Sequence, residues 1–342
     1  MESLPDGPPR IADVAAHAGV GVATVSRVLN GRGSVSPETR ARVLESIRVL
    51  DYSPSSVARN LSLRRTLVIG VVVPFFTSPS AVERVRGVVA ALEGSPYDLA
   101  LFDVESADRQ RRAFDLLGRG DRADGLLVVS LVPPPEELAR LGSLPCVLVD
   151  APSNVVPSVV VDDVFGGEIA TRHLLDLGHR RIAFMGDKPA DRFRFDSTRD
   201  RTKGFEQALA AVGLTPRPEW VREGTQNRHV ARSIAEDLLT HGERPTAVFA
   251  ASDTQALGVL EAARALGIAV PGELSVVGFD DIEIASYANL TTVRQPLFDS
   301  GRIGAALLLQ SLAGEELPAR SQMLPLELEV RGTTGPPPSL SL

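Results

Sequence analysis

From Leu67 onward the chain alternates short apolar runs with amphipathic stretches, and this alternation restricts the possible folds more than any other feature. The runs with the character of strands are LVIGVVV, YDLALFDV, DGLLVV, PCVLVD, RIAFMG, TAVFAAS and LSVVGFD. The helical stretches that separate many of them are residues 80–92, 165–177, 203–212, 230–239 and 253–266. Apolar strands alternating with helices indicate parallel sheets covered on both faces, with ligands bound beyond the carboxyl ends of the strands. The pattern is long enough for two doubly wound α/β lobes.

Composition limits the remaining possibilities. A chain of 342 residues is expected to form two or three domains, and no apolar run reaches the roughly 18 residues of a membrane span. The first ten residues, MESLPDGPPR, show no charged-then-apolar leader, so we expect no secretory signal and a cytoplasmic location. The single cysteine, Cys146, lies in an apolar run. It excludes a disulfide framework and a cysteine zinc site.

Residues 11–30, IADVAAHAGVGVATVSRVLN, predict two short helices joined by a three-residue turn that contains glycine. The second helix carries small residues and one long cation, Arg27, on its outward side. Such a helix fits a DNA major groove about 12 Å wide and can present hydrogen-bonding atoms to base edges. Taken alone, the motif leaves open an ordinary helical hairpin in a small core.

The charge of the chain is distributed unevenly. Residues 1–66 contain nine arginines and six acidic residues, a net charge of +3, whereas the whole chain has a net charge of −7. The remaining residues therefore carry −10. A basic module on an acidic body is the asymmetry expected when only one end of a protein meets phosphate.

A third helix is predicted to begin at Ser36-Pro37-Glu38, which supplies a capping side chain, a proline at the first helical position and an acid at the positive end of the helix dipole. It ends before Pro54. Residues 55–63 are short and polar, so they form either a plain linker or a segment that folds only when a partner supplies packing. The proline-rich tail from Gly335 is expected to be unstructured.

Together these motifs resemble the LacI/GalR family of transcriptional regulators. The likeness begins in the headpiece and continues in register through IGVVVP, GHRRIAF, RTKGF, RPTAVFAASDTQALG, VPGELSVVGFDD, TTVRQP and LELEVRGTT. The resemblance implies a helix-turn-helix headpiece (residues 10–52), a hinge segment (53–66) and a periplasmic-binding-protein-like core of two lobes (67–334), with disordered ends at 1–9 and 335–342. It further implies a homodimer that binds a near-palindromic operator, does not associate with membranes, and responds to a small effector in the cleft between the lobes.

The resemblance also assigns the DNA contacts by position. Arg27 can donate two hydrogen bonds to O6 and N7 of guanine, worth about 1–3 kcal/mol of discrimination, whereas Val22 and Ala23 offer apolar contact only. Leu61 matches the residue that wedges a base step apart in the minor groove, and Ala58 lies one helical turn before it. Contacts to phosphate oxygens are assigned to Thr24, Ser26 and Tyr52.

In the cleft, Arg201 matches the arginine that commonly holds the effector, and Asp280 matches the carboxylate that binds ligand hydroxyls. Charge-assisted hydrogen bonds from such a pair can hold a polyol, although each residue could instead form a surface or interlobe ion pair. Asp253 is a second candidate carboxylate. The residues assigned to the effector are Phe75, Phe76, Ser80, Ser130, Phe195, Ser197, Arg201, Gln226, Asp253 and Asp280.

Three positions depart from the family pattern. Gly21 stands where a serine usually caps the second helix, and glycine is only slightly worse as a cap. The stretch from Pro74 to Ala81 has its aromatic residues moved forward, and Thr225-Gln226 stands where an aromatic residue often follows an acid. One wall of the cleft is therefore expected to be roomier, with Phe75 or Phe76 as a stacking surface; core packing is nearly as good an interpretation of Phe76.

Two other classes of function are weaker. An enzyme would need a catalytic constellation, and the chain contains none of GxGxxG after a strand, GxxxxGK[ST], HExxH or GxSxG. A solute-binding protein would share the core but would need an export signal and would lack the headpiece. No catalytic residue, metal or cofactor is assigned. The expected effector is a sugar or oligosaccharide that releases a repressor, and the alternative is a nucleoside or another metabolite acting as corepressor.

Overall fold

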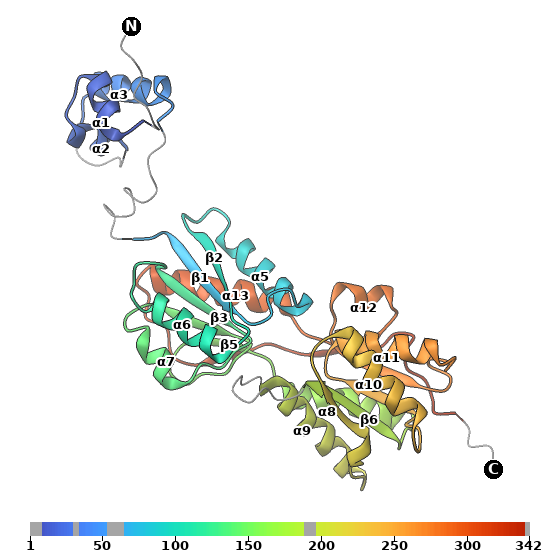
Figure 1. Ribbon diagram of the computed structural model, residues 1–342. Coiled ribbons are helices and arrows are strands. Elements are labelled where there is room, and N and C mark those ends of the chain that lie inside the picture. The colour runs from blue at the N-terminus through green and yellow to red at the C-terminus, as the bar shows by residue number, and fades with distance from the viewer. Residues whose placement is uncertain (1–8, 30–33, 53–64, 188–195, 339–342) are drawn as a thin grey trace. The chain divides into compact units, whose positions relative to one another are not determined.

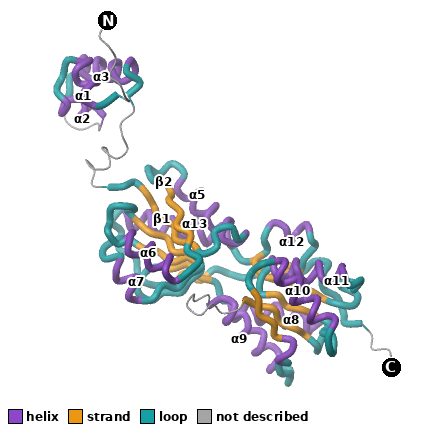
Figure 2. Tube along the Cα trace, viewed as in Figure 1, coloured by secondary structure: helices purple, strands orange, loops and turns teal. Residues whose placement is uncertain are grey.

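The computed structural model describes residues 9–29, 34–52, 65–187 and 196–338. The chain divides into two compact units, residues 1–66, which include the headpiece, and residues 67–342, which include the core. In the described part of the chain the headpiece contains helices alone, whereas the core contains both helices and strands (Figures 1 and 2). No helix among these residues is long and apolar enough to cross a membrane.

The described residues of the headpiece form the three helices that the sequence predicts, α1 (Ile11–Ala18), α2 (Val22–Leu29) and α3 (Pro37–Val49). The turn between α1 and α2 begins at Gly19, whose positive φ of 64° favours glycine. Ser36 caps α3 by accepting a hydrogen bond from the Thr39 amide. Valine and alanine side chains of the three helices pack into one small core, formed by Val14, Ala15, Ala18, Val25, Val28 and Val43.

The core consists of two lobes, each built on a six-stranded sheet within the described residues (Figure 1). Lobe 1 contains β1 (Val68–Val73), α5 (Pro79–Leu92), β2 (Asp98–Asp103), α6 (Ala107–Leu117), β3 (Gly125–Val129), α7 (Pro135–Arg140), β4 (Cys146–Val149), β5 (Ser158–Val160), α13 (Leu297–Leu312) and β11 (Ser321–Met323). Its strand order is β11-β5-β4-β3-β1-β2, with all neighbours parallel.

Lobe 2 contains α8 (Asp163–Asp176), β6 (Ile182–Asp187), α9 (Asp196–Ala211), a short 3-10 helix (Pro218–Trp220), β7 (Val221–Gly224), α10 (Arg228–Thr240), β8 (Ala247–Ala250), α11 (Asp253–Ala265), β9 (Ser275–Asp280), α12 (Glu283–Tyr287), β10 (Thr291–Arg294) and β12 (Glu327–Glu329). Its strand order is β12-β10-β9-β8-β6-β7, and only the pairing of the edge strand β12 with β10 is antiparallel. These sheets confirm the predicted doubly wound α/β core.

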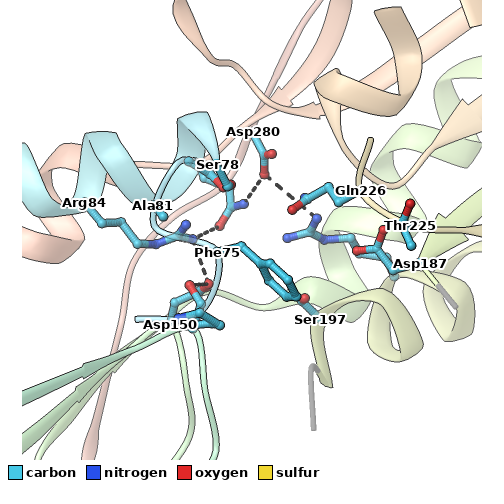
Figure 3. A pocket seen from close by; sticks show the side chains of 15 residues that line it. Phe75, Ser78, Ala81, Arg84, Asp150, Asp187, Ser197, Thr225, Gln226 and Asp280 are labelled. Atoms are coloured by element: carbon cyan, nitrogen blue, oxygen red, sulfur yellow. Dashed lines mark hydrogen bonds and ion pairs between the residues drawn. The ribbon is translucent and has the colours of Figure 1, made fainter. Parts of the chain in front are cut away.

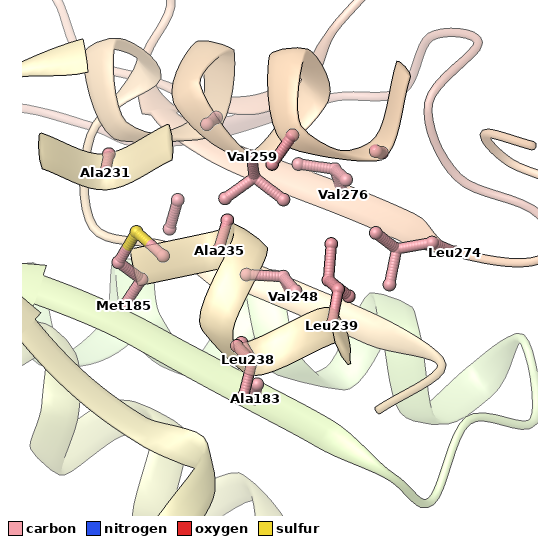
Figure 4. Packing of buried hydrophobic residues seen from close by; sticks show 14 of the residues in the cluster. Ala183, Met185, Ala231, Ala235, Leu238, Leu239, Val248, Val259, Leu274 and Val276 are labelled. Atoms are coloured by element: carbon pink, nitrogen blue, oxygen red, sulfur yellow. The ribbon is translucent and has the colours of Figure 1, made fainter. Parts of the chain in front are cut away.

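Each sheet is covered on both faces because successive strand residues point to opposite sides. In β8, Val248 packs with α10 and α11, whereas Phe249 packs with α8 and α9. Figure 4 shows the first of these layers, in which small and branched side chains fill the space between the sheet and the helices. Lobe 1 follows the same rule, with Leu126 and Leu127 of β3 in clusters on opposite faces.

The described chain passes between the lobes at three places: residues 161–162, after β5; residues 295–296, after β10; and residues 324–326, after β11. Each lobe is therefore assembled from segments far apart in the sequence. In particular, α13 lies in lobe 1 although it follows the strands of lobe 2 (Figure 1).

The segment expected to be unstructured begins in contact with lobe 2. The Gly335 amide donates to Ser275 Oγ at 3.0 Å, and the Gly335 carbonyl lies 2.9 Å from His179 Nε2. His179 is fully buried and also contacts Thr246. These contacts hold the chain at Gly335, one residue beyond the expected limit of the core.

In each lobe, one helix pair that holds a cavity arginine approaches closely through glycine. On α13, a methyl group at Gly301 would overlap the backbone carbonyl of Arg84 on α5. On α8, a methyl group at Gly167 would overlap the backbone carbonyl of Arg201 on α9. A glycine inside a helix costs about 0.5–1 kcal/mol relative to alanine. The gain is close packing, which sets the position of one arginine in each lobe.

We expect Gly301→Ala to lower the free energy of unfolding of the core by about 1–3 kcal/mol, because the new methyl group must push α13 away from α5. Urea unfolding of the full chain measures the effect. Gly272→Ala is the matched control, because a methyl group there would meet only Ala269 at 3.7 Å. Equal stabilities of the two variants would contradict the close-approach argument.

Candidate functional site

A cavity of about 170 Å³ lies between the two lobes at the carboxyl ends of their strands (Figure 3). Pro74 and Phe75 follow β1, Ser130 follows β3, and Asp187 and Asp280 end β6 and β9. This is the position that ligands occupy in open α/β sheets. The other lining residues among those described are Ser78, Ser80, Ala81, Arg84, Asp150, Ser197, Arg201, Thr225, Gln226 and Gln295.

A continuous run of polar contacts crosses this cavity (Figure 3). Arg84 Nη2 lies 2.9 Å from Asp150 Oδ2 and donates to Gln295 Oε1 at 3.1 Å. Gln295 Nε2 in turn donates to Asp280 Oδ1 at 2.6 Å. Gln295 belongs to the crossover after β10, so this side chain joins a cation of lobe 1 to a carboxylate of lobe 2.

Arg201 completes the run on the lobe 2 side. Its Nε donates to Asp163 Oδ1 at 2.8 Å, and its Nη1 lies 3.9 Å from Asp280 Oδ1. Nη1 also donates to the carbonyl of Ala251, and the guanidinium carbon lies 3.6 Å from the centre of the Phe279 ring. The side chain is only 5% exposed, so these partners compensate for the loss of water around a buried cation.

Two carboxyl groups of the cavity, those of Asp187 and Asp280, have raised pKa values. Burial raises the pKa of Asp187 to about 6, although the charge of Arg201 opposes that rise. Burial likewise raises the pKa of Asp280, again against the attraction of Arg201. Asp187 is held by Gln255 Nε2 at 3.0 Å and by Thr198 Oγ1 at 3.4 Å. These groups can accept hydrogen bonds from a ligand that is rich in hydroxyl groups.

The backbone is strained where it enters the cavity. Phe75, Ser130, Asp150 and Asp280 have positive φ values of 49°, 50°, 59° and 115°. Non-glycine residues adopt this region rarely, at a cost of order 1–3 kcal/mol each, and such residues cluster at functional sites. Here the strained residues lie at or just after the ends of β1, β3, β4 and β9 and carry side chains that line the cavity.

Most of the residues assigned to the effector from the sequence are brought together here. The seven that line the cavity are Phe75, Ser80, Ser130, Ser197, Arg201, Gln226 and Asp280. Phe195 lies outside the described residues. Phe75, half exposed, provides an aromatic face, as expected for the altered stretch after β1.

Phe76 and Asp253 do not line the cavity, and their assignment to it is corrected. Phe76 lies in a separate apolar groove with residues of α5 and with Phe298, and its 43% exposure also excludes core packing. Asp253 is fully buried beneath the cavity, where it accepts hydrogen bonds from the Ile282 amide at 2.9 Å and from Thr292 Oγ1 at 2.6 Å. Asp253 thus fastens the start of α11 to the segment that follows β9 and to β10.

Several lining residues were missed. Asp150 and Asp187 follow or end apolar strands, so the rule that ligands lie beyond the carboxyl ends of strands could have found them. Arg84 lies on an amphipathic helix, where a charged residue usually faces solvent, and here it is 3% exposed. Gln295 lies in the TTVRQP motif, but the motif does not show that its side chain reaches the cavity, because that depends on where the crossover passes.

The headpiece presents the residues assigned to base contacts on one side of α2. Val22, Ala23 and Arg27 are exposed, while Val25 and Val28 are buried. Arg27 Nε donates to the Ala23 carbonyl at 3.2 Å, so the guanidinium remains at the surface. Thr24, Ser26 and Tyr52 are half-buried, and Tyr52 packs against the headpiece core. Ala58 and Leu61 of the hinge lie outside the described residues.

Comparison with known proteins identifies the class. Residues 10–55 match the model of bacterial regulatory proteins of the lacI family, and residues 171–334 match that of the periplasmic binding protein-like domain. The chain is 33% identical to catabolite control protein A of Priestia megaterium over 335 residues, which are 95% of this chain and 98% of that protein.

Two solved structures extend the likeness to the whole fold. The transcriptional regulator CelR in complex with cellobiose is 33% identical, with a TM-score of 0.70, over 95% of this chain and 99% of that one. The Lac repressor dimer bound to operator and the anti-inducer ONPF is 28% identical, with a TM-score of 0.83, over 96% of this chain and 100% of that one. The chain belongs to the LacI family. It is a DNA-binding transcriptional regulator and not an enzyme, which confirms the prediction from sequence.

Asp187 makes the stability of the core depend on pH. Its pKa in the folded protein, about 6, is above the ordinary value of 3.8, so the folded state binds the proton more tightly than the unfolded state does. Its contribution to stability is therefore fully present below about pH 4 and is lost as the pH rises through 6. We expect Asp187→Asn to remove this part of the pH dependence. Urea unfolding between pH 4.5 and 7.5 measures the free energy of unfolding of each protein, with Asp121→Asn at an exposed position as the control. If the difference in this free energy between wild type and Asp187→Asn did not change with pH, the prediction would be contradicted.

In the headpiece, Arg27→Ala should weaken binding to a specific site by about 1–3 kcal/mol, because a bidentate contact to guanine is lost. The specific site can be selected from random DNA with the wild-type protein, and affinity measured by anisotropy at one salt concentration. Arg48→Ala is the control, since Arg48 is exposed on α3 and engaged with Glu45 at 2.6 Å. An equal loss on selected and random DNA would show that Arg27 contacts phosphate only.

Proposed function

We propose that the protein is a homodimeric repressor whose operator binding is controlled by a carbohydrate in the interlobe cavity, and that it acts in the cytoplasm on genes of carbohydrate uptake or catabolism. The observation that carries the proposal is the lining of this cavity. Carboxylates, guanidinium groups, amides and hydroxyls surround it on both lobes, and Phe75 adds an aromatic face. Hydroxyl groups of a sugar can form hydrogen bonds with these polar groups, and a C–H face of the sugar ring can pack on the Phe75 ring.

The size of the cavity supports the same class of ligand. One water molecule requires about 10–15 Å³ of a cavity. A volume of 170 Å³ therefore accommodates on the order of ten to fifteen ligand atoms. A hexose has about a dozen non-hydrogen atoms. CelR, the regulator solved with cellobiose, is a relative that covers nearly the whole chain, which makes a carbohydrate the first class to test.

The control of DNA binding follows from the position of the site. A ligand between the lobes contacts both, so it binds one relative arrangement of the lobes more tightly than others and shifts the equilibrium between them. The Lac repressor, solved as a dimer on its operator, is the precedent for the assembly that we propose.

The direct test combines ligand binding with operator binding. Purified full-length protein is screened by thermal shift against monosaccharides, disaccharides and nucleosides, because a bound ligand raises apparent stability by mass action. Each ligand that binds is then added to the complex of protein and selected operator. Release by a sugar supports the proposal. Release or tighter binding with a nucleoside alone would establish the alternative effector class, and no effect of any compound would reject a carbohydrate effector.

Arg201→Lys should weaken effector binding at least tenfold while operator affinity without ligand stays unchanged, because lysine keeps the charge beside Asp163 but loses the planar fork of donors. Titration calorimetry and operator release measure the two effects. Arg199→Lys, at an exposed position of the same helix, is the matched control. Equal effector affinities of the two variants would remove Arg201 from the binding site.

A further inference from the structure

A second cavity of about 340 Å³ adjoins the effector cavity. The two share Ser130, Asp150 and Ser197 as lining residues. Of these, Ser130 and Asp150 stand at the ends of β3 and β4, where Ser130 Oγ donates to Asp150 Oδ2 at 2.7 Å. These shared side chains form the boundary between the two cavities.

The ion pair of Arg201 and Asp163 separates the two spaces elsewhere. Arg201 lines the effector cavity, Asp163 lines the second cavity, and their side chains meet at 2.8 Å. The two cavities are therefore separated here by a polar pair with hydrogen-bonding atoms on each side. These atoms can bind the middle of a ligand that extends from one cavity into the other.

The lining of the second cavity is amphipathic. Apolar side chains form much of it, among them Val132 and Val161, with Pro152 and Met323 at its exposed margin. Hydroxyl and carboxylate groups such as Ser321 and Asp162 stand beside them. A sugar ring has the same character, with C–H groups on its faces and hydroxyl groups around its edge.

The second cavity also borders two places where the chain crosses between the lobes. Residues 161–162 lie in the first crossover, and Met323 is the last residue of β11, directly before the third. Gln295 of the remaining crossover lines the effector cavity. A ligand that fills both cavities therefore contacts the surroundings of all three connections.

From this geometry we propose that the effector is a disaccharide or a larger glycoside, with one ring in the effector cavity and the next in the second cavity. The proposal rests on the carbohydrate effector proposed above and narrows it, because a monosaccharide would leave the second cavity unused.

The test uses a variant that fills the second cavity alone. Met323 is 59% exposed on the edge strand β11, and it lines the second cavity but not the effector cavity. Met323→Trp therefore places a larger side chain in the second cavity without replacing a core residue. Val330→Trp is the matched control, since Val330 is also 59% exposed and lines neither cavity. Pro152→Trp also narrows the second cavity but leaves β11 unchanged. If both tryptophan variants lose disaccharide binding, the cause is the filled cavity and not a distortion of β11. Thermal unfolding verifies that each variant is folded.

Calorimetry with full-length protein compares cellobiose and maltose with glucose, and lactose with galactose. We expect at least one disaccharide to bind tenfold or more tightly than its component monosaccharides. Met323→Trp and Pro152→Trp should reduce that affinity at least tenfold, with less than a twofold change for the monosaccharides and no change in Val330→Trp. Equal affinities for monosaccharide and disaccharide, or variants that affect both alike, would overturn the two-cavity proposal while leaving a carbohydrate effector intact. If no sugar binds the wild-type protein, the proposed function fails and this inference fails with it.

Discussion

The core depends on a single constraint, the burial of two guanidinium groups at the junction of its lobes. Arg84 and Arg201 are 3% and 5% exposed, and a buried cation without partners is strongly destabilising. Asp150 and Asp163 pair with them, and Asp280 with Gln295 joins the two halves. The lobes therefore meet through a polar network, and hydrophobic packing stays within each lobe.

This arrangement suits a protein that must change state. Hydrophobic clusters make each lobe rigid, and the glycine contacts at Gly301 and Gly167 fix the helices that carry the two arginines. Polar contacts across the cavity can be exchanged for contacts with a hydroxylated ligand at little net cost, because hydrogen bonds replace hydrogen bonds. Strained residues at the strand ends fix the backbone from which several of these side chains enter the cavity.

Local patterns in the chain predicted local structure well. The apolar runs coincide with β1, β2, β3, β4, β6, β8 and β9, and the Ser-Pro-Glu sequence marks the start of α3. The family resemblance led to Asp280, whereas the rule that ligands lie beyond strand ends was not applied to Asp150 and Asp187. Phe76 was a candidate because the aromatic residues after β1 are displaced relative to the family pattern. The two neighbouring rings point to different places: Phe75 lines the cavity, and Phe76 lies in a separate groove.

The sequence by itself determined the class of the protein, the helix-turn-helix and the two-lobed α/β core, since periodicity, capping and motif order are local properties that the chain carries in any conformation. Only the tertiary structure decided which side chains form the site. In the structure, Gln295 lies between the lobes and Arg84 is buried. Asp253 is buried and does not line the cavity, and a second cavity adjoins the first. These outcomes depend on three crossovers that bring distant segments together, and no local pattern records where a crossover passes.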